Sequence, residues 1–216
     1  MSPFQVDPDL AAALFYTMGF QVPHRFDREE EARRLAESIP NKEKRLLKVV
    51  SLCGVINTPR EYYLALKAYS WLGAEYREEV ARYAVAYLNT PGWSELPHST
   101  VTENGILVDQ RATVRASVLV DLAQAQDAGG KHEAAVSNFM EAYRLEPYNA
   151  MHVIKAADII ERTRGREEAL QFLLQQKSGS SYYTPVKYKD GAGNVCRNDT
   201  FKRLLDAHIR KLTPQE

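Results

Sequence analysis

The amino-acid sequence predicts an all-α fold made of antiparallel helix pairs. Three observations lead to this prediction. Apolar residues recur every three or four positions along most of the chain, which is the spacing that places them on one face of a helix. Prolines and glycines divide these stretches into segments of ordinary helical length. Small side chains recur at positions where two helices would cross, which allows their axes to approach closely.

The composition is that of a globular protein without net charge. The chain has 28 basic and 28 acidic residues, so its overall charge does not favour nucleic acid or an anionic membrane as a partner. Its two cysteines, Cys53 and Cys196, are too few for a disulfide framework and are expected to be reduced. The N-terminus lacks the basic and apolar regions of a signal peptide, and no apolar run reaches membrane length. We therefore expect a cytoplasmic protein that does not enter a membrane.

Residues 1–90 are expected to form an N-terminal helical region. Its clearest helix start is Thr58-Pro59-Arg60-Glu61. The threonine can cap the free amides of the first turn, and the proline occupies a position where its missing N–H had no partner. The helices expected in this region cover residues 10–16, 28–39, 42–55, 59–72 and 77–88. Several prolines and glycines then mark residues 91–107 as a loop between two parts of the chain.

Residues 108–180 are expected to hold regular helix pairs, followed by a hairpin and a capping helix in residues 181–216. The helices expected cover residues 109–128, 132–145, 150–163, 166–177 and 201–212. The segment 182–197 predicts a short β-hairpin, because β-prone residues flank the glycine-rich stretch Asp190 to Asn194. We expect Asn198 or Asp199 to cap the last helix.

One stretch of this second part has a regular spacing of small and turn-forming residues. Residues 116–149 span 34 positions. Gly130 suits a left-handed turn between two helices, and Pro147 cannot continue the second helix. Apolar and small residues occupy the positions where the two helices would pack and cross: Leu122, Ala123, Ala135, Phe139, Ala142 and Leu145.

This pattern resembles the tetratricopeptide repeat (TPR), a family of 34-residue helix pairs. Leu119 stands where the family usually has tryptophan, and Gln126 where it has tyrosine. Degenerate copies cover residues 150–183, in phase with the first, and residues 60–93. The resemblance implies a right-handed TPR-like helical solenoid, whose concave groove binds another protein or a peptide segment. An ordinary helical bundle with one fortuitous repeat is the alternative fold.

The resemblance also places a candidate peptide-binding groove on the first helix of each repeat. The residues at the family's groove positions are Ser117, Val120, Asp121, Gln124, Asp127, Met151, Ile154, Lys155, Asp158 and Arg162, with Leu64, Ala68 and Trp71 from the weakest copy. Their mixture of apolar and acidic side chains favours a helical or extended segment with apolar and basic residues. The alternative is that Val120, Ile154 and Trp71 pack against neighbouring helices.

The sequence contains no motif that would indicate catalysis, a cofactor or a metal. Its histidines form no HExxH motif and no close pair with a cysteine; they are His24, His98, His132, His152 and His208. The stretch Gly191-Ala192-Gly193 lacks the strand–glycine–helix context of a dinucleotide site. We therefore expect no cofactor, no metal and no catalytic residue.

The function predicted from these observations is that of a protein- or peptide-binding scaffold. One alternative is a structural protein that associates with itself as a homo-oligomer. A less favoured alternative is an enzyme or a nucleic-acid binder built on a helical scaffold.

Overall fold

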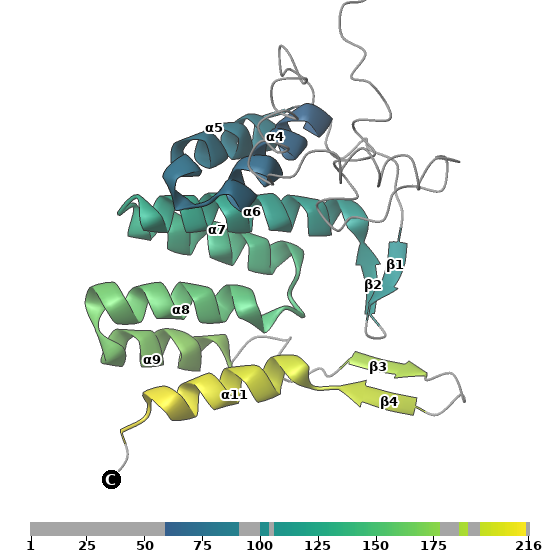
Figure 1. The fold of residues 1–216 in the computed structure, drawn as a ribbon. Helices are drawn as coiled ribbons and strands as arrows, with labels where there is room; N and C mark the ends of the chain where they lie inside the picture. Colours follow the sequence, from purple (N-terminus) through teal and green to yellow (C-terminus); the bar gives the residue numbers. More distant parts are fainter. Residues whose placement is uncertain (1–58, 91–99, 104–105, 178–185, 190–194, 215–216) are drawn as a thin grey trace, which may run out of the picture. The chain divides into compact units, whose positions relative to one another are not determined.

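The computed structural model describes residues 59–90, 100–103, 106–177, 186–189 and 195–214. The described residues are mainly helical, with seven α-helices and two pairs of short strands (Figure 1). This agrees with the predicted all-α class. The helices expected over 10–16, 28–39 and 42–55 lie outside the described residues. In the part of the chain that is described, no helix is both long enough and apolar enough to span a membrane.

The chain divides into two compact units, Met1–Tyr87 and Leu88–Glu216. The described helices that belong mainly to the first unit are α4 (Pro59–Leu72), the 3-10 helix η1 (Ala74–Tyr76) and α5 (Arg77–Leu88). Helices α4 and α5 contact each other through tyrosine rings. The rings of Tyr69 and Tyr83 stack with their centroids 5.8 Å apart.

The second unit contains five of the helices. They are α6 (Gln110–Ala128), α7 (His132–Leu145), α8 (Ala150–Arg164), α9 (Arg166–Gln176) and α11 (Thr200–Leu212). Each of the first four contacts the next one in the chain, and successive helices run antiparallel (Figure 1). Helix α11 packs against both α8 and α9. The bounds of these five helices lie within one residue of those predicted from the sequence.

The first pair of strands lies where a loop was predicted. Strand β1 (Thr100–Glu103) pairs antiparallel with β2 (Ile106–Asp109), with Val101 opposite Val108. These strands are rich in β-branched residues, which favour extended backbone. The sequence between them is Asn104-Gly105, a dipeptide typical of two-residue hairpin turns.

The second pair of strands falls within the segment 182–197. Strand β3 (Val186–Lys189) pairs antiparallel with β4 (Val195–Asn198), and Tyr188 stands opposite Cys196. Helix α11 begins directly after β4. Asp199 occupies the N-cap position of α11, but its side chain makes no capping hydrogen bond, so the expected side-chain cap is not formed.

Glycine and asparagine residues make the turns between the helices of the second unit. Gly130 has a φ of 77° after α6, and Gly165 has a φ of 103° between α8 and α9. Both values lie in the region that L side chains rarely adopt. Asn149 caps α8, since its side chain accepts a hydrogen bond from the amide of Met151 at 3.2 Å.

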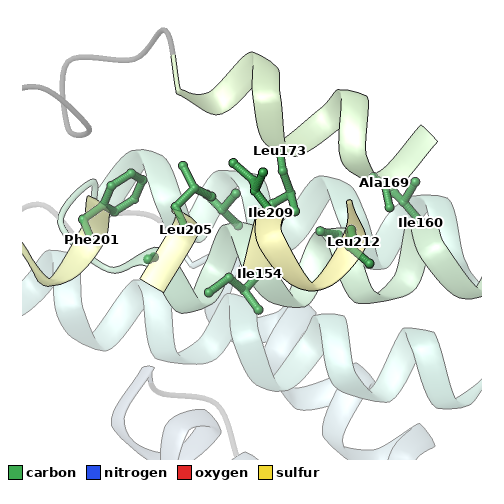
Figure 2. Packing of buried hydrophobic residues seen from close by; sticks show 11 residues of the cluster. Ile154, Ile160, Ala169, Leu173, Phe201, Leu205, Ile209 and Leu212 are labelled. Atoms are coloured by element: carbon green, nitrogen blue, oxygen red, sulfur yellow. The ribbon is translucent and has the colours of Figure 1, made fainter. Parts of the chain in front are cut away.

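The core of the second unit is built from small residues at the helix crossings and larger ones between them. One buried cluster joins α6, α7 and α8 through Ala123, Ala135, Phe139, Ala156 and Ile159. The predicted crossing residues Ala123, Ala135 and Ala142 are fully buried. A second buried cluster joins α8 and α9 to α11 (Figure 2).

Candidate functional site

The ten candidate groove residues differ in exposure and fall into exposed, half-buried and buried groups. Ser117, Val120, Asp121, Gln124 and Asp127 lie on α6, and Met151, Ile154, Lys155, Asp158 and Arg162 lie on α8. Gln124, Met151, Lys155 and Arg162 are exposed, whereas Asp121 and Ile154 are buried and the other four are half-buried. In the weakest copy, Ala68 is fully buried. The side chains of Leu64 and Trp71 are not among those that the structure describes.

Two candidate residues on different helices are brought together at the end of α6. Arg162 of α8 donates a hydrogen bond to Oδ1 of Asp127. The Nδ1 atom of His132, at the start of α7, lies 2.8 Å from the same oxygen. Burial raises the pKa of Asp127, but the hydrogen bonds from His132 and Arg162 outweigh it and hold the pKa below its ordinary value. This cluster connects α6, α7 and α8 through polar contacts, and the side chain of Arg162 is 56% exposed.

Ile154 belongs to the core. Its side chain is 7% exposed and shares a buried cluster with Phe201, Leu205 and Ile209 of α11. Figure 2 shows Ile154 beside the apolar side of α11. The chain's own C-terminal helix therefore covers this candidate position.

Asp158 lies next to the same helix. Its Oδ1 atom is 3.1 Å from Nε2 of His208 on α11, although the two groups are not hydrogen-bonded. Asp158 is therefore a second candidate position that α11 reaches.

Val120 and Asp121 face inward on α6. Val120 packs against the cluster that contains Ala123 and Phe139. Asp121 is only 9% exposed. Apart from Arg162, which pairs with Asp127, the exposed candidate positions are Gln124, Met151 and Lys155. We refer to these three residues as the exposed set.

A buried acid–histidine pair at the α7–α8 turn was not predicted from the sequence. Nε2 of His152 lies 2.7 Å from Oε2 of Glu146, and the two side chains are 8% and 9% exposed. Asn149 donates a further hydrogen bond to Glu146 at 3.3 Å. Burial raises the pKa of Glu146, but the hydrogen bonds from His152 and Asn149 outweigh it, so the pKa lies below its ordinary value.

Both side chains of this pair are almost completely buried. The geometry of the pair holds the turn Glu146–Asn149 against the first turn of α8, where Asn149 also caps the helix. The sequence carried only a weak signal for it: a carboxylate just before Pro147 and a histidine six positions further on.

Within the described part of the chain, no three His, Cys, Asp or Glu side chains gather closely enough to hold a metal ion. Neither a scan against protein-family models nor a search of curated proteins finds a match for this chain.

Proposed function

We propose that this chain is a TPR-like scaffold that binds another protein, with α6–α7 and α8–α9 as two repeats of a right-handed solenoid. The observation that carries the proposal is the equivalence of the two helix pairs. Ala123 and Ala157 are 34 positions apart, as are Ala135 and Ala169, and all four are fully buried. Two helix pairs that cross through small residues at the same positions can stack in the same way.

The packing order supports the same proposal. Helix α7 contacts both α6 and α8, so the second helix of one pair packs against the first helix of the next pair. Repeat arrays bury a continuous core in this way, because each unit alone cannot cover its own apolar face. Helix α11 follows at the end of the array, where a capping element is needed.

The exposed set is where we place the contact with a partner. Met151 is a large apolar side chain with 42% of its surface exposed, and Lys155 lies one helical turn further along α8. The carboxylates of Asp121, Asp127 and Asp158 are enclosed or face groups of the chain itself. The proposed partner segment therefore carries apolar and acidic side chains, in place of the basic ones that the sequence had suggested.

An affinity pull-down from a lysate of the source organism tests this function. The variant is Lys155→Glu, which reverses the charge of the exposed set, and the matched control is Lys131→Glu, which changes an exposed lysine in the α6–α7 turn. A protein held by the wild type and by the control, but lost by Lys155→Glu, is the expected result. Retention of every captured protein by Lys155→Glu would contradict the placement, and recovery of the chain's own copies alone would favour self-association.

A further inference from the structure

Helix α11 is amphipathic, and its apolar side is buried. Its apolar residues Phe201, Leu205, Ile209 and Leu212 are all buried, and they recur at the spacing that forms one stripe on a helix. Its other side is exposed and basic, with Lys202, Arg203, Arg210 and Lys211.

The surface that receives α11 is formed by α8 and α9. Ile154, Ile160, Ala169 and Leu173 of these helices share one buried cluster with the stripe of α11 (Figure 2). We call these four residues the docking face. Its floor is apolar, and such a surface accepts any apolar stripe of the right spacing, because hydrophobic contact has no direction.

Polar groups at the edges fix how the helix lies on this face. Nζ of Lys177 is 3.1 Å from Oδ1 of Asp206. At the other end, the guanidinium of Arg166 donates hydrogen bonds to the backbone carbonyls of Leu212 at 2.6 Å and of Lys211 and Thr213 at 3.0 Å. Lys177 therefore binds a carboxylate near the middle of the helix, and Arg166 binds the backbone carbonyls at its C-terminal end.

The chain connection distinguishes α11 from the other helices of its unit. Helices α6 to α9 are joined by residues 129–131, by residues 146–149 and by Gly165 alone, whereas residues 177–199 connect α9 to α11. A segment on a longer connection can leave its site without unfolding the helices before it. While attached, α11 competes with any free ligand for the same surface.

We propose that the docking face is a binding site for an amphipathic helix of a partner protein, and that α11 is its resident occupant, which the partner helix displaces. The partner helix presents an apolar stripe with the spacing of Phe201, Leu205, Ile209 and Leu212 and an acidic side chain toward Lys177. This inference extends the proposed function, because Ile154 and Asp158 occupy candidate groove positions: α11 covers Ile154 and lies next to Asp158.

The test uses the full chain and a fluorescently labelled synthetic peptide of residues 199–214. The chain variant Asp206→Lys places two positive charges together and loosens the attached helix, while the peptide keeps its own carboxylate for Lys177. We expect the peptide to bind this variant about twofold to fivefold more tightly than the wild type, as measured by fluorescence anisotropy. The chain variant Leu205→Ala removes a fully buried side chain and is expected to increase binding by more than about tenfold.

Two controls make the result specific. The double exchange Lys177→Asp/Asp206→Lys restores the ion pair within the chain and opposes the carboxylate of the peptide, so its peptide binding should be no tighter than that of the wild type. A peptide with Leu205→Asp and Ile209→Asp should bind none of the chains. Circular dichroism of each variant establishes that its remaining helices are folded.

Two outcomes would overturn the proposal. Peptide binding that is absent or unchanged in both Asp206→Lys and Leu205→Ala would make α11 a permanent cap. A dimer that forms in these variants at micromolar concentration and excludes the peptide would assign the docking face to the α11 of a second copy. Because this test needs no partner from a lysate, its failure is distinguishable from failure of the contact at Lys155.

Discussion

The imidazole of His152 lies with its Nε2 atom 2.7 Å from Oε2 of Glu146, and both side chains are more than nine-tenths buried. The pair closes the α7–α8 turn, which is the junction between the two proposed repeats. The relative placement of the two helix pairs therefore depends on a polar contact as well as on apolar packing.

Removal of the imidazole should destabilise the second unit. The substitution His152→Ala leaves a carboxylate of Glu146 enclosed without its nearest partner, and the expected loss is about 1–3 kcal/mol in the free energy of unfolding. Urea denaturation followed by circular dichroism measures it. The matched control is His132→Ala, whose contact with Asp127 is 36% and 23% exposed and should contribute less than about 1 kcal/mol. Equal losses in the two variants would show that burial of the pair has no consequence.

Stability should fall in acid because of the same carboxylate. The pKa of Glu146 is lower in the folded chain than its ordinary value of 4.5. The unfolded state therefore binds protons first as the pH falls, so the stabilisation from this group is complete above that ordinary value and is lost as the pH falls through the folded pKa. The variant Glu146→Gln should be less stable at neutral pH and should lose less stability than the wild type between about pH 5 and pH 3. Parallel pH profiles of the melting temperature would contradict this assignment.

The helix crossing at Ala135 should not tolerate a larger side chain. Ala135 is fully buried among Ala123, Phe139 and Ala156, so Ala135→Leu must displace a neighbour and is expected to cost about 1–3 kcal/mol. The control Ala128→Leu changes an exposed alanine at the end of α6 and should stay within about 0.5 kcal/mol of the wild type. Denaturation midpoints compare the two. A neutral Ala135→Leu would mean that close approach of α6, α7 and α8 is not required.

The turn between α8 and α9 should require glycine for conformational reasons alone. Gly165 has φ 103° and ψ 167°, a region that is nearly exclusive to glycine, and a Cβ atom there would meet nothing within 4 Å. Gly165→Ala should therefore cost about 1–3 kcal/mol without any steric clash. Gln171→Ala, at an exposed position of α9, is the control. A melting temperature unchanged by Gly165→Ala would show that the turn can rearrange at no cost.

The helices could be predicted from the sequence because their limits depend on neighbouring residues. Gly130, Pro147 and Asn149 each act on the backbone within a few positions of themselves, so the bounds of α6, α7 and α8 follow from local chemistry. The strands β1 and β2 were also marked locally, by Asn104-Gly105, and were missed because nearby prolines and glycines indicated a loop.

Which of the candidate groove residues are exposed and which are buried could not be predicted in the same way. Ile154 suits a groove position and a core position equally well, and only the packing of α11 against α8 decides between them. The contact of Asp158 with His208 joins residues that are distant in the sequence, and no local pattern indicates it. The alternative that Val120 and Ile154 pack internally was open at the level of the sequence, and the structure places both against the core.

The central claim is that the exposed set contacts a partner protein, and site-specific photocrosslinking tests it most directly. A photoreactive amino acid is introduced at Gln124 or at Lys155, and at Gln171 on α9 as the control, and each chain is irradiated in a lysate of the source organism. If the exposed set contacts a partner, both of its labelled positions form an adduct with the same protein and position 171 does not. Adducts confined to the chain's own copies, or the same adducts from all three positions, would contradict it.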